Sequence, residues 1–392
     1  MKKTYLIIAG CTLVVLLLAI WVYLLIYGTP KPVEQFFTDF NLGDNSELTT
    51  DTPFIPEDTT ERVDVVDAAP LRQLTTRAVI GYGEYSNNTE NKNVIRYAEA
   101  GTGHVYEINL LTGTEIRLSN ITIPNVEAAQ FSPDGTKVAI GSGFGNQNTI
   151  QLLTLAGENS ATKETLSPKM VDFIFNDNNE LLYTEYSSAG QSGNLLKTDT
   201  KTSQTLFTVP FQNATIVWSI DGDTQHYVYP KPSAKLNGFL YRLQNGTLIR
   251  ESASGEGLTA EINAQYYIHT ITTDNGPVSF FTDRTTGTRA SLPIIVEPSK
   301  CVFAPDNNKY LYCGHEGVGL TNEFPDNWYK GLISFSDKLY KIDLEKSLAA
   351  QLVSPEQETG RELDVIDMNI SQEGKVLYFI NKNDNTLWMY EI

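Results

Sequence analysis

The chain has 392 residues, 41% of them hydrophobic, and a formal net charge of −18 at pH 7. A nucleic-acid surface needs clustered Lys and Arg, so this charge argues against nucleic-acid binding, and it also argues against broad attraction to anionic lipid. The 20 Tyr and 17 Phe are typical of a protein with many short strands.

The first 27 residues contain a candidate membrane-spanning helix. Lys2 and Lys3 are followed by residues 5–27, a stretch of 23 residues without a charge. As a helix this stretch is roughly 34 Å long, enough to cross a bilayer core. Because basic residues mark the cytoplasmic side, we expect a single-pass protein of the cell membrane. Its N-terminus lies in the cytoplasm and the remainder lies outside.

Cys11 allows a second interpretation of this region. Residues 8–11, Ile-Ala-Gly-Cys, resemble a bacterial lipobox, in which Cys11 would be lipidated after cleavage. However, the apolar stretch before Cys11 is short for a signal peptide, and 16 uncharged residues follow it. We therefore favour a membrane helix that contains Cys11 and keep lipidation as the alternative.

Residues 28–70 differ in composition from the rest of the chain. They hold five Pro and ten acidic residues against two basic ones, Lys31 and Arg62. Such a segment has too little apolar surface to fold, and its charges repel one another. We therefore expect three parts: a cytoplasmic tip with the membrane helix (1–27), an acidic flexible stalk (28–70), and a folded domain (71–392).

From residue 71 onward, apolar and polar residues alternate, and turn residues interrupt the pattern about every eight to twelve residues. Pro133-Asp134-Gly135 predicts a hairpin turn. The unit around this turn predicts four strands, over residues 126–131, 136–140, 149–155 and 163–166. Related units recur about every 44 residues, beginning near residues 78, 171, 216, 260, 301 and 365.

Seven four-stranded units at this period predict an all-β fold, a single β-propeller of seven blades preceded by one membrane helix. The last unit has only three strands, which end at residue 392. Residues 71–75 have the pattern of an outer strand, and we expect them to supply the missing strand and close the ring. Six blades remain the alternative, because the units near residues 78 and 260 lack the turn signature.

Residues 131–135, Phe-Ser-Pro-Asp-Gly, with the strands at 138–140 and 150–157, resemble the WD40-like repeat of the TolB-type β-propellers. This repeat is a structural signature, in which the Phe packs between blades and Pro-Asp-Gly forms a turn. The resemblance therefore implies the architecture and carries over no catalytic residue. Members of this group are often bacterial envelope proteins and interaction scaffolds. TolB-type rings usually have six blades, so seven units depart from that pattern.

The sequence lacks the common catalytic motifs. It has no Gly-x-Ser-x-Gly elbow, no Walker loop and no Gly-x-Gly-x-x-Gly fingerprint. The four His, which are His104, His226, His269 and His315, fall in different units without the spacing of metal ligands. We expect no catalytic set, no cofactor and no metal, with a metal held by one or two of these His as the alternative.

The loops between the second and third strands are long, and in a propeller they share one face, here called the top face. The longest, residues 314–337, holds Phe324, Pro325, Trp328 and Tyr329, which form our candidate binding loop. Exposed aromatic side chains anchor many protein partners. The alternative is that this loop folds over the central channel and plugs it.

Cys301 and Cys313 are a candidate disulfide. They flank the hairpin at residues 302–312, one on each strand, and an extracytoplasmic location permits the bond. Directly opposed Cys can be bridged, whereas a diagonal pair would be strained. The alternative is two buried free thiols.

These observations favour a membrane-anchored extracytoplasmic β-propeller that acts as a protein-binding or scaffolding module of the cell envelope. Its partners would be proteins of the envelope and the membrane itself, through the N-terminal helix. The alternative is a carbohydrate-binding or glycan-processing enzyme with a site on the top face. A top-face pocket that holds two carboxylates about 10 Å apart or less would favour the enzyme.

Overall fold

The computed structural model describes residues 69–87, 92–143, 149–166, 170–219, 225–244, 246–316 and 320–392. The predicted membrane helix and almost all of the predicted stalk lie outside these residues. In the described ranges, no helix is both long enough and apolar enough to cross a membrane.

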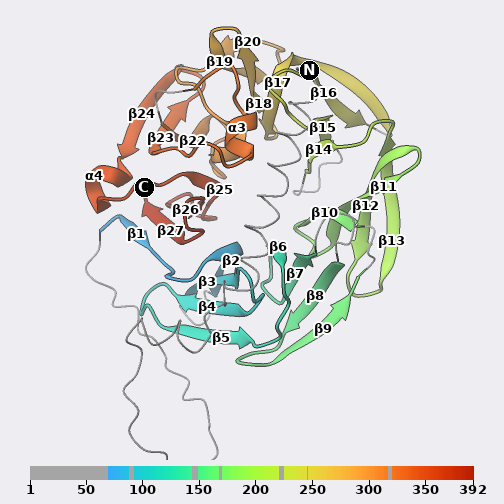
Figure 1. Ribbon diagram of the computed structural model, residues 1–392, viewed down its shortest axis with the longest axis vertical. Coiled ribbons are helices and arrows are strands. Elements are labelled where there is room, and N and C mark those ends of the chain that lie inside the picture. The colour runs from blue at the N-terminus through green and yellow to red at the C-terminus, as the bar shows by residue number, and fades with distance from the viewer. Residues whose placement is uncertain are drawn as a thin grey trace, which may run out of the picture. The chain divides into compact units, whose positions relative to one another are not determined.

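The described residues form five four-stranded antiparallel sheets and one seven-stranded sheet, which follow one another around a closed circle (Figure 1). The first sheet holds β2 (Val79–Asn87), β3 (Lys92–Glu99), β4 (Val105–Asn109) and β5 (Glu115–Ser119). The second holds β6 (Val126–Phe131), β7 (Lys137–Ser142), β8 (Thr149–Leu155) and β9 (Ala161–Thr165). The third holds β10 (Met170–Phe175), β11 (Leu181–Ser187), β12 (Gly190–Lys197) and β13 (Thr202–Val209).

The seven-stranded sheet consists of two groups that share a strand. Its strands are β14 (Ala214–Val217), β15 (Tyr227–Pro230), β16 (Asn237–Gln244), β17 (Thr247–Ile262), β18 (Tyr266–Thr273), β19 (Gly276–Asp283) and β20 (Arg289–Ser291). Residues 247–256 of β17 pair with β16, and Glu256 together with residues 259–262 pairs with β18. Between them Gly257 has a φ of 61°, which favours glycine. One long strand thus ends the group β14–β17 and begins the group β17–β20.

The last two sheets complete the circle. One holds β21 (Cys301–Phe303), β22 (Tyr310–His315), β23 (Lys338–Asp343) and β24 (Leu348–Val353), and the other holds β25 (Val365–Ile370), β26 (Val376–Asn381), β27 (Leu387–Glu391) and β1 (Leu71–Gln73). The short helices are η1 (Pro298–Lys300), α3 (Asp326–Tyr329) and α4 (Pro355–Thr359). Because β1 pairs with β27, with Leu71 opposite Tyr390, the prediction that residues 71–75 supply the missing outer strand is confirmed.

Hydrophobic side chains fill the spaces between neighbouring groups. One cluster joins Phe207 of β13 to Val228 of β15, and another joins Ile95 of β3 to Tyr378 of β26. In the described part of the chain there are seven such clusters, one at each junction. The junction that contains Tyr378 joins the last sheet to the first, so the ring of interfaces is closed.

The predicted turn at residues 133–135 forms as expected. The Asp134 carboxylate accepts hydrogen bonds from Ser132 Oγ at 2.7 Å and from the backbone N–H of Thr136 at 2.9 Å. Gly135 has a φ of 71°, which a side chain would disfavour. Phe131 is buried in the cluster between the first two sheets. Local turn chemistry and inter-sheet packing therefore agree at this unit.

Candidate ligand cavity and the opposite end of the ring

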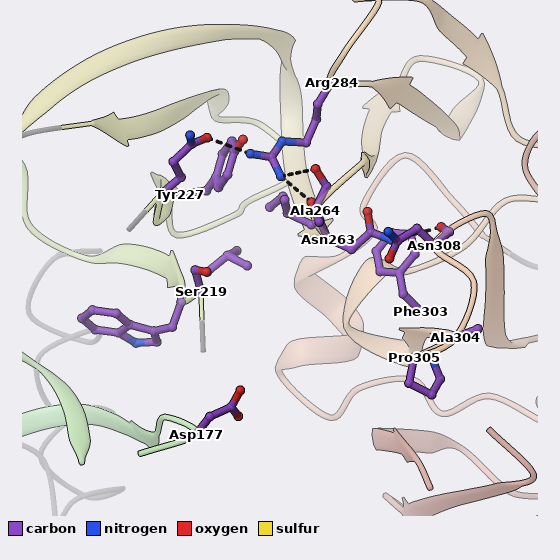
Figure 2. A pocket seen from close by; sticks show the side chains of 14 residues that line it. Asp177, Ser219, Tyr227, Asn263, Ala264, Arg284, Phe303, Ala304, Pro305 and Asn308 are labelled. Carbon is purple, nitrogen blue, oxygen red and sulfur yellow. Dashed lines mark hydrogen bonds between the residues drawn. The ribbon is translucent and has the colours of Figure 1, made fainter. Parts of the chain in front are cut away.

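A cavity of about 400 Å³ lies at the end of the ring where the first strand of each group turns into the second (Figure 2). We call this the hairpin end. Four successive groups contribute to the wall, through Asp177 after β10, Trp218 after β14, Asn263 after β17 and Pro305 after β21. The other lining residues are Val217, Ser219, Gln225, Tyr227, Ile262, Ala264, Arg284, Phe303, Ala304 and Asn308.

Arg284 is fixed in the wall of this cavity by neutral acceptors (Figure 2). Its Nη1 donates to the carbonyl oxygens of Asn263 at 2.6 Å and Ala264 at 2.8 Å, and its Nη2 donates to Gln225 Oε1 at 2.8 Å. Its guanidinium carbon lies 5.2 Å from the ring centre of Tyr227. The guanidinium is therefore held in one orientation before any ligand arrives.

The turn that presents these carbonyls is built by the Asn263 side chain. Its Oδ1 accepts hydrogen bonds from the backbone N–H groups of Gln265 and Tyr266, at 2.9 and 2.6 Å. Its Nδ2 donates to the carbonyl oxygen of Asn308 at 3.0 Å, which ties the hairpins of two neighbouring groups together. An Asx-type turn leaves the main-chain carbonyl outward, where Arg284 binds it.

Aromatic rings form the apolar part of the wall. The Trp218 ring centre lies 5.7 Å from that of Phe207 and 5.1 Å from that of His226. The Trp218 Nε1 atom is buried and has no hydrogen-bond partner in the described part of the chain. Burial raises the pKa of Tyr227 to about 12, although Arg284 opposes the shift, so the phenol stays neutral. The wall therefore combines aromatic rings, amides and the guanidinium of Arg284.

The opposite, long-loop end of the ring is covered by residues 320–337, here called the cover loop. Phe324, Pro325 and Trp328 are buried, and of the candidate binding loop only Tyr329 is exposed, at 45%. Asp326 accepts hydrogen bonds from Ser233 Oγ at 3.2 Å and from the Ala234 N–H at 2.5 Å.

Further bonds tie the cover loop to other groups of the ring. Thr272 Oγ1 donates to the Phe324 carbonyl and Lys382 Nζ donates to the Trp328 carbonyl, each at 2.5 Å. Three of the four predicted anchor residues therefore pack inward. This placement differs from an exposed aromatic surface.

A buried ionic cluster lies beneath the cover loop. Lys300 Nζ donates to Asp337 Oδ2 at 2.5 Å and to Asp364 Oδ1 at 2.6 Å, and these side chains are at most 2% exposed. Trp328 Nε1 donates to Asp364 Oδ2 at 2.9 Å. Burial raises the pKa of Asp337, while Lys300 opposes the shift. The indole and the ammonium thus share one carboxylate and fasten the cover loop to the ring.

No family model and no curated protein matches the chain. Solved structures do match it. An oligogalacturonate lyase in complex with manganese has a TM-score of 0.55 at 11% identity, covering 82% of this chain and 93% of that one. An oligogalacturonate lyase from Vibrio parahaemolyticus has a TM-score of 0.56 at 10% identity, with the same coverage. A putative 6-phosphogluconolactonase from Bacteroides fragilis has a TM-score of 0.51 at 14% identity, covering 78% and 92%.

These structures are all of the β-propeller kind. The chain is a β-propeller. Identities of 10–14% show the fold alone, so the activities in these names belong to those proteins. For the propeller described above, the predicted resemblance in architecture is confirmed.

The four His, whose sequence spacing does not fit metal ligands, lie apart in the propeller. His104 precedes β4, His226 precedes β15, and His269 and His315 lie in β18 and β22. Among the residues that the structure describes, no group of three or more His, Cys, Asp or Glu is placed to hold a metal ion. Burial lowers the pKa of His269 to about 3.

The two predicted disulfide partners lie directly opposite one another. Cys301 of β21 pairs in register with Cys313 of β22, and their Sγ atoms are bonded at 2.09 Å. Both side chains are buried in the cluster between the β17–β20 and β21–β24 groups.

We expect mass spectrometry of the unreduced, unfolded protein to find the peptides that contain Cys301 and Cys313 linked, since opposed strands hold the two thiols together. Cys11 should remain alkylatable in the same sample unless it is lipidated. Full alkylation of all three Cys without reductant would rule the bond out.

Glu297, which precedes η1, makes stability depend on pH. It is 4% exposed, and burial raises its pKa to about 7 despite hydrogen bonds from Tyr329, Ser299 and Thr259. Because the folded state favours the protonated form, stability is full below about pH 4.5 and is lost as pH rises through about 7. The shift corresponds to roughly 3 kcal/mol.

We expect Glu297→Gln to remove most of this pH dependence in urea unfolding between about pH 4.5 and 8. Glu158→Gln, at an exposed position, should leave it unchanged. If the wild type and Glu297→Gln showed parallel pH profiles, Glu297 would be ionised in the fold like an ordinary carboxylate.

Sequence reasoning missed the cavity because it searched the long loops. The lining residues lie in short hairpin turns of four groups. The sequence of each turn, taken alone, predicts only an ordinary turn. Two residues carried a signal. Arg284 is a cation within the turn Asp283–Gly287, and Trp218 directly follows a first strand. A large aromatic and an unpaired cation at the same end of neighbouring blades indicate a site near the axis.

Proposed function

We propose that this propeller is a binding module of the cell envelope that takes a short segment of a protein partner into the cavity at its hairpin end. The observation that carries the proposal is the cavity itself. Its volume of about 400 Å³ falls in the range of pockets that hold small ligands. It therefore suits a few protruding residues of a partner, which a rigid ring can bind with little loss of its own entropy.

The composition of the wall favours binding over catalysis. Among the fourteen described residues that line it, Arg284 and Asp177 carry charge, and they come from different groups. Rings of Trp218 and Tyr227 supply apolar contact, and Arg284 and the Asn308 amide supply polar contact, which together are typical of recognition sites.

The test is site-specific photo-crosslinking in intact cells. A photoreactive amino acid at Ser219 or Asn308, both in the lining, should form an adduct of one defined mass with the partner. The matched control is Leu348, which is 61% exposed and lies on β24, the edge strand opposite β21 in its sheet. No adduct at either lining position, or the same adduct at Leu348, would refute the cavity as the site.

We further propose that the ring has seven blades. The group β14–β17 and the group β17–β20 each count as one blade, with β17 serving both, and the seven inter-group clusters support the same count. A six-blade reading would have to treat the seven-stranded sheet as one unit, although the cluster that contains Tyr229 and Leu258 separates its halves as at every other junction.

The location is part of the proposal: residues 1–27 anchor the chain, 28–70 form the stalk and 71–392 lie outside the cytoplasm. Lys2 and Lys3 before the apolar stretch support this orientation. We expect protease added to intact cells to release a folded fragment that starts within 28–70. Protection of the chain while the membrane stays sealed would show the opposite orientation.

A second candidate function is action on an acidic glycan, since the fold is shared with the two oligogalacturonate lyases. The supporting observation is a group of buried carboxylates, Glu297, Asp337 and Asp364, near the top face. Incubation of the full-length protein with oligogalacturonate, followed by product analysis, tests it. Product that Glu297→Gln abolishes would favour the enzyme, and absence of product would remove this candidate.

A further inference from the structure

We infer that the cavity recognises its partner by an acidic side chain, which Arg284 binds. This inference rests on the proposed function and specifies the chemistry of the bound segment. The geometry of the Arg284 bonds carries it.

Arg284 keeps donor capacity for a ligand. A guanidinium has five N–H groups. Within the described residues its hydrogen-bond partners are the carbonyl oxygens of Asn263 and Ala264, Gln225 Oε1 and the Tyr227 phenol. These four partners engage at most four of the five N–H groups, which leaves at least one for a carboxylate oxygen.

The charge of Arg284 is also not neutralised by the groups that hold it. Its partners are two amide carbonyls, one side-chain amide and the Tyr227 phenol, and within the described ranges no carboxylate lies at ion-pair distance from it. A cation that is fixed by neutral dipoles in a partly enclosed cavity attracts an anion more strongly than a surface Arg does. Its stack on Tyr227 limits the freedom that binding has to remove.

The test uses a phage-displayed library of random heptapeptides against the full-length protein in detergent micelles. Wild-type protein should enrich peptides that share an Asp or Glu at one position. In a selected peptide, changing that residue to Asn or Gln should weaken binding about tenfold or more, the effect of losing a charge-assisted hydrogen bond. Because this arm changes only the peptide, it does not depend on how any variant folds.

Variants of the protein separate this inference from the proposed site. Ser219→Trp should fill the cavity and abolish binding. Arg284→Gln should lose the preference for the acid, and Arg284→Lys, which keeps the charge but not the fork, should retain part of it. If Ser219→Trp abolishes binding but the peptide acid is dispensable, the cavity stands and the role of Arg284 is refuted. If Ser219→Trp binds as well as wild type, the proposed site itself is refuted.

Discussion

A chain that begins at residue 78 is expected to be much less stable than one that begins at residue 69. The lost segment contains β1, which pairs with β27, and it buries Leu71 and Leu74 to 4% and 7% exposure. Thr75 Oγ1 also accepts a hydrogen bond from the Leu387 N–H at 3.0 Å. Removing two buried Leu side chains alone costs at least about 4 kcal/mol. The loss also leaves β27 with an open edge that can pair between molecules.

Urea unfolding and light scattering measure this effect. The shorter chain should unfold at lower urea and scatter more light after incubation at moderate temperature. The chain that begins at residue 69 is the matched control, because it retains every residue of β1. Equal unfolding midpoints for the two chains would mean that β1 does not contribute to closing the ring.

Lys300→Met is the second substitution with a large expected effect. Lys300 is the cation between Asp337 and Asp364, and all three side chains are at most 2% exposed. Removing the cation leaves two buried carboxylates together, and Asp337 Oδ1 already has no partner within the described residues. Breaking a buried pair in this way costs roughly 3–5 kcal/mol. The cover loop should also loosen, since Trp328 binds the same Asp364.

Chemical unfolding of Lys300→Met measures the loss of stability, and limited proteolysis near residues 326–332 reports the loosened loop. Adding Asp337→Asn and Asp364→Asn should restore much of the stability, because the charges are then removed together. Lys375→Met is the control, since Lys375 forms an exposed pair with Glu373 and should change little. A Lys300→Met protein as stable as this control would show that the cluster is not charged in the folded state.

The repeating units and the closure could be predicted because their signals are local. The turn at Pro133-Asp134-Gly135 uses an Asp side chain and a Gly that each specify the turn on their own, and alternation specifies the strands beside it. Residues 71–75 were identified by counting strands, since the last unit had three. Cys301 and Cys313 could be paired because one short hairpin separates them.

The inward packing of the cover loop could not be predicted in the same way. Phe324 and Trp328 lie in a loop, where sequence alone cannot distinguish an exposed anchor from a plug. The groups that hold them, Thr272, Lys382 and Asp364, come from distant parts of the chain. The burial of Lys300 beside Asp337 and Asp364 also cannot be predicted from sequence, because Lys and Asp are ordinarily exposed.

The cavity was missed for the same reason. The lining residues are divided among the hairpins of four groups, and only the closed ring brings these hairpins around one space. Arg284 is held in the cavity wall by hydrogen bonds to Asn263, Ala264 and Gln225, which belong to other turns. The long loops, which predict a binding site from sequence, lie at the opposite end of the ring, which the cover loop covers.

Hydrogen–deuterium exchange with a selected heptapeptide tests most directly whether the hairpin end is the ligand site. At saturating peptide, we expect slower exchange in residues 214–219, 262–266 and 303–308, which surround the cavity. The cover loop, residues 320–337, should exchange at its unliganded rate. Protection confined to the cover loop, with none at the three hairpins, would contradict the account and place recognition at the long-loop end.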